Sequence, residues 1–214
     1  ESFAINGINE MLSDHFFLDG FHKEHSPMYH MYVSNYLHQL EEAMWLSGSN
    51  NLSKLAQKAK ISVQKYIMPD GFFAPIGDSS LSNRADALCI FPIHKDSNGT
   101  PSAPPGIHIF PEGGVAIIST TTKKGVADEH MVFTGQFHSR QHKHADDLSI
   151  NYCVKGKRYL IDAGTFTYHY DQEERMYVES TRAHNTIEID GLNFSRFRLD
   201  TYGSALKRVI KVGD

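Results

Sequence analysis

The sequence predicts an α+β protein in which a helical first half precedes a β-rich second half. Apolar residues recur with a helical period in the first part of the chain, and from about Gly106 they alternate with a period of two. The stretch between them, SNGTPSAPPG, is rich in Pro, Gly and Ser and continues neither a helix nor a sheet. We therefore expect a helical region over 1–95, a linker over 96–106 and a sheet region over 107–214. At 214 residues the chain is long enough for one large domain or two modest ones.

Three helices are expected in the first half. The first spans 1–16, where apolar residues fall near helical spacing, and the second spans 26–46, with Ser26 as N-cap and Pro27 at the first helical position. The third, over 52–68, places apolar residues on one side and lysines on the other, and it ends at a Pro-Asp-Gly turn.

Six short runs in the second half are expected to be strands. They are rich in β-branched and aromatic residues and are separated by Gly or Asp-Gly turns, a pattern typical of a β-sandwich or barrel. The runs are 115–120, 130–139, 148–154, 158–163, 185–190 and 204–212.

Composition excludes several classes of protein. The net charge of −4 argues against a protein that coats nucleic acid, so any anion-binding surface must be local. Cys89 and Cys153 are far apart and form no CxxC, which indicates neither a thiolate zinc site nor a disulfide scaffold, although one bridge stays possible. No apolar run approaches the ~20 residues of a membrane helix, and the first residues lack the pattern of a signal peptide.

The 13 histidines are unusual, and the motif QHKHADD at 141–147 concentrates two of them. His142 and His144 would point the same way if this stretch were extended. Asp162 and His184 lie at expected strand ends and could complete a site, and three N/O ligands with an open position suit Zn²⁺. Spacing alone leaves open that these are solvated polar residues at loop ends.

A second cluster, DGFHKEHSPMYH, opens the second expected helix. Tyr29 beside His30 could form a proton-transfer pair, because a neighbouring cation or a helix start favours the phenolate. The alternative is that Tyr29 lies at the edge of the core and His30 on the surface.

Positive charge and aromatic rings offer further binding groups. Five basic residues between 136 and 158 could form an anion-binding patch beside the His motif, or simply a solvated hairpin. They are Arg140, Lys143, Lys155, Lys157 and Arg158. Tyr168 is among the aromatic residues that could stack on a sugar, although core packing explains most aromatic residues.

Taken together, four segments resemble the heparinase II/III family of polysaccharide lyases, which includes oligoalginate lyases. They are DGFHKEHSPMYH, PDGFFAPIGDS, FPEGGVAIIST and, most specifically, the long segment 142–191 that begins HKHADDLSINYC. The resemblance implies the last helices of an α/α toroid followed by the start of an antiparallel β-sandwich.

The resemblance also implies roles for individual residues. Tyr29 matches the family's catalytic base, which also serves as acid, and His142 matches a histidine that faces the cleft from the sandwich. His144, Asp162 and His184 match the residues that hold a zinc ion with a structural role in several members. The remaining candidates, which we assign to substrate binding, are His22, Glu24, His30, Arg140 and Tyr168.

One departure from the family pattern concerns the groups that neutralise the substrate carboxylate. Family members supply an Asn or an Asn-His pair from helices well before the SPxYH segment, and the chain begins only 25 residues before Ser26. We therefore expect an internal fragment of a longer lyase, or a reduced relative.

Two other interpretations of the sequence stay open. A cupin-like metalloenzyme would explain the HxH motif, but the Glu expected after it is missing and the helical half is unexplained. A non-catalytic module that binds acidic polysaccharides would use the basic patch alone.

The expected partner is an acidic polysaccharide or oligosaccharide, with neither nucleic acid nor membrane insertion. A periplasmic or secreted location follows only from that substrate class, and the sequence does not choose among heparan sulfate, alginate, hyaluronate and bacterial capsular uronans.

Overall fold

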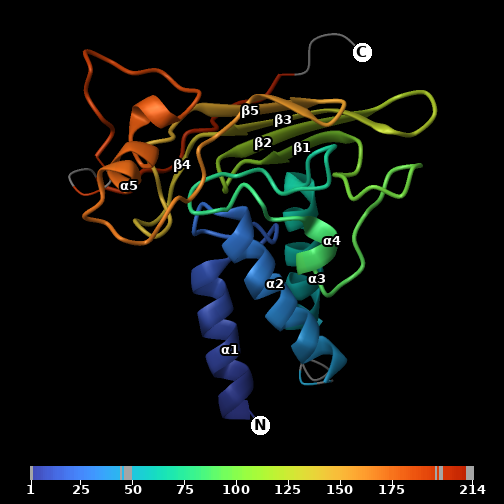
Figure 1. The fold of residues 1–214 in the computed structure, drawn as a ribbon. Helices are drawn as coiled ribbons and strands as arrows, with labels where there is room; N and C mark the ends of the chain where they lie inside the picture. The colour runs from blue at the N-terminus through green and yellow to red at the C-terminus, as the bar shows by residue number, and fades with distance from the viewer. Residues whose placement is uncertain (1, 44, 46–49, 196, 198–199, 211–214) are drawn as a thin grey trace.

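The computed structural model describes residues 2–43, 45, 50–195, 197 and 200–210. Helices come first and an antiparallel sheet follows, so the predicted α+β class is confirmed. In Figure 1 the three long helices run side by side below the sheet, with the N-terminus at the far end of the helices from the sheet.

The helical half is close to the prediction, with its ends shifted by a few residues. Its elements are α1 (Ser2–His15), α2 (Pro27–Glu42), α3 (Asn50–Val63), a 3₁₀ turn η1 (Gln64–Tyr66) and α4 (Ala85–Leu88). The second helix ends at Glu42 rather than reaching position 46, and residues 44 and 46 lie outside the described residues. The third begins before position 52 and tightens into η1.

Five strands form the main sheet, in the order β1-β2-β3-β5-β6 with every neighbouring pair antiparallel. They are β1 (Gly106–Phe110), β2 (Val115–Thr121), β3 (Ala127–Thr134), β5 (Ser149–Val154) and β6 (Lys157–Leu160). Buried and half-buried residues alternate along β2 and β5, as a strand with one covered face requires. The two-residue strands β4 (Gln136–Phe137) and β7 (Gly203–Ser204) pair separately.

The last part of the chain is less regular than predicted. The run 185–190 is not a strand, and only position 204 of the run 204–212 lies in one; residues 211–214 are outside the described residues. The side chains of Ile187 and Ile189 are exposed, so no buried face holds this segment in a sheet. The short helices α5 (Glu173–Val178) and η2 (Thr181–Ala183) precede it, and α5 lies at the left of Figure 1, beside β4.

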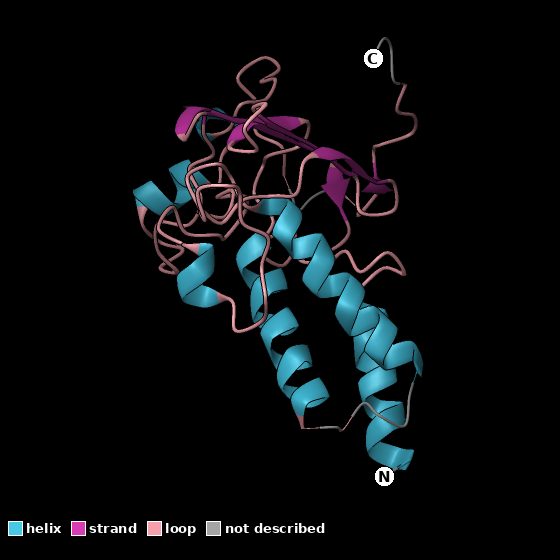
Figure 2. Ribbon diagram, turned by 90° about the vertical axis from the view of Figure 1, so that its right-hand side faces the viewer, coloured by secondary structure: helices cyan, strands magenta, loops and turns pink. Residues whose placement is uncertain are grey.

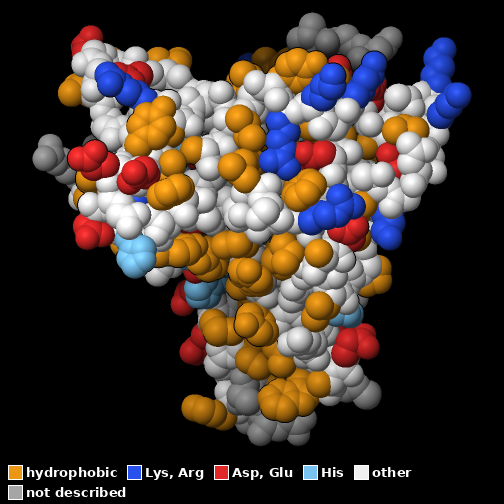
Figure 3. Space-filling model, in the orientation of Figure 1, with side chains coloured by type: hydrophobic (Ala, Val, Ile, Leu, Met, Phe, Trp, Pro, Cys, Tyr) orange, Lys and Arg blue, Asp and Glu red, His pale blue; other side chains and the backbone are white. Residues whose placement is uncertain are grey.

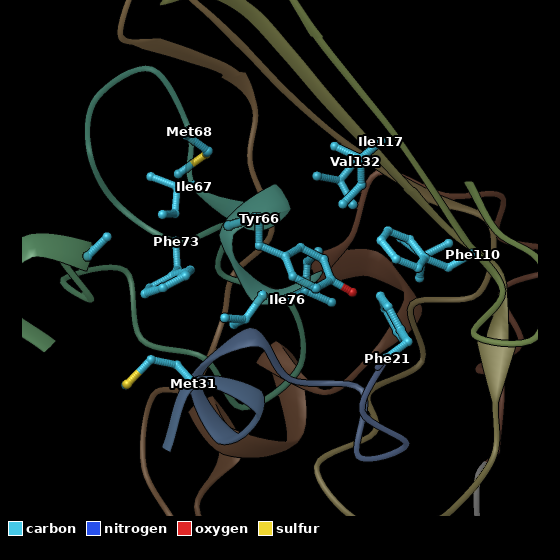
Figure 4. Packing of buried hydrophobic residues seen from close by; sticks show 14 of the residues in the cluster. Phe21, Met31, Tyr66, Ile67, Met68, Phe73, Ile76, Phe110, Ile117 and Val132 are labelled. Atoms are coloured by element: carbon cyan, nitrogen blue, oxygen red, sulfur yellow. The ribbon is translucent and has the colours of Figure 1, made fainter. Parts of the chain in front are cut away.

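The helical half and the sheet share one hydrophobic core. Phe21, Tyr66 and Phe73 from the helical half pack with Phe110 and with inward residues of β2 and β3, as Figure 4 shows. Figure 2 shows the helices below the sheet with loops filling the space between them. The two halves are therefore coupled, while the division into domains at 96–106 stays a prediction.

The 96–106 segment is hydrogen-bonded to both halves. The backbone N–H of Ala103 donates to the Ile67 carbonyl in the helical half, and that of Ser97 donates to the Gly125 carbonyl beside the sheet. This segment therefore adds to the contact between the halves.

The surface carries many apolar side chains, and both cysteines are free. Figure 3 shows hydrophobic side chains gathered over the helices on one face. Among the described residues, no helix is both long and apolar enough to cross a membrane. Cys89 and Cys153 are free thiols, so the possible bridge between them is not formed.

Candidate active site

A cavity of about 930 Å³ lies where the helical half meets the loops of the second half. Residues of both halves line it, among them Glu24, Tyr29, Asp78, Arg140, His142 and Tyr170. The cavity therefore joins the two clusters that the sequence singled out separately.

Tyr29 lies in the first turn of α2, whose start is fixed by a loop of the same half. Ser26 has extended backbone angles, but its side chain makes no capping hydrogen bond, which corrects the expectation for this residue. The capping oxygen comes from Ser79 instead, which accepts the backbone N–H of Met28 at 3.0 Å and pairs with the Ser26 hydroxyl at 2.9 Å. The helix that carries Tyr29 is thus anchored to the loop that contains Ser79.

The Tyr29 ring stacks on the His142 ring. Their centroids are 3.5 Å apart with an angle of 17° between the planes. The Tyr29 hydroxyl also lies 3.0 Å from the Tyr168 hydroxyl. Burial, followed by the hydrogen bond with Tyr29, raises the pKa of Tyr168. Tyr168 is therefore a neutral phenol that can donate its proton to the Tyr29 oxygen.

Asp78 lies next to this pair and is buried, with only 1% of its surface exposed. Its carboxylate accepts from His142 Nδ1 at 3.0 Å and from His144 Nε2 at 3.0 Å, and it lies 2.6 Å from Arg175 Nη1. Burial alone would raise the pKa of Asp78, but these three donors together bring it well below its usual range. Asp78 is ionised at neutral pH and fixes the orientation of both histidines of the HxH motif.

That motif is not extended as the spacing argument assumed, because His142 has a φ of 55°. The two histidines nevertheless meet one group, the Asp78 carboxylate. Gly77 makes this approach possible, because its φ is +54° and a Cβ there would lie 2.5 Å from the His142 carbonyl oxygen.

His25 holds the loop that carries His142. Its Nε2 accepts the backbone N–H of His138 at 2.9 Å, and its Nδ1 lies 3.3 Å from the Gln141 carbonyl oxygen. Burial lowers the pKa of His25 to about 3, so the ring is neutral and can accept and donate at once. A local sequence pattern gives no signal for this contact.

The other predicted binding residues divide into two groups. Glu24 and Arg140 line the cavity, and Glu24 Oε2 lies 3.7 Å from His142 Nε2. His22 and His30 are buried and are not among the lining residues, and their stacked rings have centroids 5.7 Å apart. Burial is the main reason why the pKa of each lies far below its usual value.

The predicted basic patch is not one surface. Lys143 is buried and pairs with Asp146 and Asp147, and Arg158 pairs with Asp70 at 2.6 Å. Arg140 remains as the basic residue of that set that lines the cavity.

His144, Asp162 and His184 come together as a buried cluster. One potential ligand atom from each lies within 4.8 Å of the others. His184 Nδ1 is 2.8 Å from Asp162 Oδ2, while His184 Nε2 and His144 Nδ1 are buried and have no hydrogen-bond partner in the part of the chain that the structure describes. Burial lowers the pKa of His184 and the Asp162 carboxylate raises it, with an upward net shift. Two orphaned imidazole nitrogens beside a carboxylate fit the N/N/O ligand set of a zinc ion.

Sequence reasoning missed three residues that organise the site: Ser79, which caps α2, and the pair Asp78 and Arg175. Asp78 falls within a segment that carried the family resemblance, but nothing local distinguishes it from a surface acid. Arg175 follows a run of acidic residues that is typical of an exposed segment. In the structure it is fully buried and pairs with both Asp78 and Glu179. Its guanidinium also lies 5.7 Å from the centre of the Tyr168 ring.

Comparison with known proteins gives a consistent result. The family model described as heparinase II/III-like, C-terminal, matches residues 102–209. A search of curated proteins found no match.

Several solved structures share the fold. A heparinase III gene product aligns with a TM-score of 0.71 at 20% identity, over 88% of this chain and 32% of that one. A heparan sulfate lyase, HepC from Pedobacter heparinus, gives 0.68 at 19% identity, over 86% and 32%. A further heparinase III gives 0.66 at 18% identity, over 86% and 34%. The chain thus spans about a third of the length of each of these structures.

Proposed function

Because the chain belongs to the heparinase II/III-like family, we propose that it carries the base of a polysaccharide lyase that cleaves a uronic-acid-containing polymer by β-elimination. The observation that carries the proposal is the contact between Tyr29 and His142, which stack at a cavity open to both halves of the molecule. Neither ring belongs to the hydrophobic core clusters, so packing of the core does not explain why they lie together.

Tyr29 is proposed to remove the proton from C5 of the uronate. The phenolate that does this is supported by the Tyr168 hydroxyl at 3.0 Å and by the start of α2, where the positive end of the helix dipole favours negative charge. The electron pair of the C5–H bond forms the C4–C5 double bond as the C4–O bond breaks. The leaving oxygen takes up a proton, which the Tyr29 phenol can return, and the product has an unsaturated uronate end.

The substrate carboxylate must be neutralised for C5–H to become acidic enough. His142 and Arg140 line the cavity and are proposed to contact that carboxylate. Asp78 holds His142 through Nδ1, which leaves Nε2 to face Glu24 or a substrate. We assign polymer contacts to Glu24, Arg140 and Tyr168, and we leave His22 and His30 out because they are buried and do not line the cavity.

A zinc ion is proposed at His144, Asp162 and His184, where it would order the loops of the second half. Asp78 links this cluster to the cavity, since it contacts both His142 and His144. His144 would be held for the ion by Asp78 in the way that carboxylates orient metal-bound histidines. The ion has no part in the proposed proton transfer.

The substrate class also suggests where the protein works. Acidic polysaccharides of this kind lie outside the cytoplasm, so a periplasmic or secreted location is proposed.

A second function, binding of acidic polysaccharide without cleavage, is favoured by one observation. The chain covers only 32% of a solved heparinase III, so groups from the rest of such a protein would be needed for catalysis.

The test is formation of unsaturated uronate ends from a panel of acidic polysaccharides, with the full gene product and with this chain alone. Tyr29→Phe keeps the ring and its stacking but removes the titratable group, so turnover should be lost while polymer binding is kept. Tyr36→Phe, an exposed residue of the same helix, is the matched control. Full activity of Tyr29→Phe would refute the assignment, and binding without any cleavage by the full gene product would favour the second function.

A further inference from the structure

A second cluster of metal-ligand type lies outside the predicted zinc site, at the end of α1. It consists of His15, His22 and Glu24, whose potential ligand atoms lie within 4.8 Å of one another. His15 is the last residue of α1, and the other two follow the turn after it. The mechanism above uses neither histidine.

The backbone holds these three residues in place. Phe16 and His22 form an antiparallel bridge, and the N–H of Lys23 donates to the His15 carbonyl at 2.9 Å. The intervening turn is closed by the N–H of Phe17, which donates to the Phe21 carbonyl at 2.9 Å. The chain therefore returns beside the end of α1, and the positions of His15 and His22 do not depend on a flexible loop.

His22 is the observation that points to a ligand. Only 2% of its surface is exposed, yet both ring nitrogens are buried without a hydrogen-bond partner among the described residues. A buried polar group without a partner is costly, and native structures rarely keep one without an unseen water or ion. His22 is also absent from the lining of the cavity at Tyr29, so a substrate in that cavity does not explain it.

The neighbouring groups supply what a cation needs. Glu24 Oε1 lies 3.3 Å from His15 Nδ1, and the Glu24 carboxylate supplies the negative charge among these three side chains. The His15 side chain is 41% exposed and that of Glu24 15%, so solvent can reach the cluster and complete the coordination. Two imidazoles, one carboxylate and an open position suit a divalent transition metal such as Zn²⁺ rather than Mg²⁺ or Ca²⁺.

We propose that His15, His22 and Glu24 form a second binding site for a divalent transition-metal ion, separate from the cluster of His144, Asp162 and His184. Glu24 connects this site to the cavity, because its Oε1 faces His15 and its Oε2 faces His142 at 3.7 Å. An ion held through Oε1 leaves Oε2 free to face His142. The proposal goes beyond the lyase function and does not depend on it.

The test counts bound zinc in protein that has been stripped with chelator, reloaded with Zn²⁺ and desalted. The variants are His15→Gln, His22→Asn and Glu24→Gln, and the matched control is His169→Gln, which changes an exposed histidine outside both clusters. Each of the three variants should bind one equivalent less than the wild type, or bind it at least tenfold more weakly by calorimetry, and the control should not change. Circular dichroism checks that each variant is folded.

The assay compares the amount of bound zinc in each variant with that in the wild type. The comparison is therefore valid whether or not the cluster at His184 binds an ion. A His184→Ala background isolates the second site and should still bind one equivalent that Glu24→Gln then removes. Equal zinc content in the wild type, His15→Gln and Glu24→Gln would overturn the proposal. If His22→Asn fails to fold, the other two variants decide, since both residues are partly exposed and both replacements keep the side-chain size.

Discussion

Replacing Asp78 by Asn should destabilise the protein strongly, although the two side chains have almost the same shape. The Asp78 carboxylate is 1% exposed and is contacted by His142, His144 and Arg175. An amide keeps one acceptor oxygen but turns an NH₂ group towards donors, and it leaves the buried Arg175 paired with Glu179 at 2.5 Å.

The size of the effect follows from that geometry. Removing one partner of a buried ion pair costs roughly 3–5 kcal/mol, and the contact with Glu179 places the loss near the lower end, at about 3 kcal/mol. For a chain of this length 1 kcal/mol shifts the Tm by about 2–4 °C, so Asp78→Asn should melt about 9 °C lower.

The assay is thermal and urea unfolding followed by circular dichroism, in zinc-free buffer and with zinc. The matched control is Asp86→Asn, because Asp86 is also paired with an arginine, at 2.8 Å, but on the surface. The control should melt close to the wild type, since exposed ion pairs contribute little. An Asp78→Asn protein as stable as the control would refute the view that this carboxylate organises the site.

Three further predictions concern zinc, backbone strain and pH. In a Glu24→Gln background, zinc at 100 times the Kd of the cluster of His144, Asp162 and His184 should stabilise the protein by about 2.7 kcal/mol, and it should not stabilise the Glu24→Gln, His184→Ala double variant, as measured by Tm; an equal gain in both would contradict the site. Gly77→Ala should lower the stability by about 1–3 kcal/mol in urea unfolding, because φ is +54° and the added Cβ would lie 2.5 Å from the His142 carbonyl oxygen; unchanged stability would show that the loop can move away. Burial lowers the pKa of His130 to about 4, so its neutral form is favoured in the fold. The free energy of unfolding that depends on neutral His130 is fully present above the unfolded-state pKa. It is lost as the pH falls towards the folded-state pKa, and the loss between pH 7 and pH 5 is about 2 kcal/mol. His130→Gln should show a correspondingly shallower loss of stability over that range, and an unchanged pH dependence would contradict this.

The parts of the fold with a strong local period could be predicted from the sequence. The three long helices and four of the five main strands coincide with predicted runs. The helices and β2, β3 and β5 each bury one face, whereas β6 is mostly exposed and is held by its pairing with β5. The run 185–190 has the same alternation but lacks a covering layer among the described residues, and its Ile187 and Ile189 are exposed. Period alone could not distinguish these cases.

The site was predictable only in part. Family resemblance singled out Tyr29 and His142 separately, and the structure places their rings in contact. Asp78, Ser79 and Arg175 were missed because their partners lie far away in the sequence, and a buried acid or arginine looks like a surface residue in a local window. His22 and His30 were predicted as binding residues because they are close to Tyr29 in sequence, but both are buried and neither lines the cavity.

The most direct test of the central claim, that Tyr29 and His142 act as one reactive unit, is a double-mutant cycle on kcat/KM in the full gene product. The cycle compares Tyr29→Phe, His142→Ala and the double variant, with formation of unsaturated uronate ends as the readout. Groups that act together in one step are strongly non-additive, so the double variant should be no less active than Tyr29→Phe alone. Losses that simply add would contradict the account, because they would mean that the stacked rings act independently.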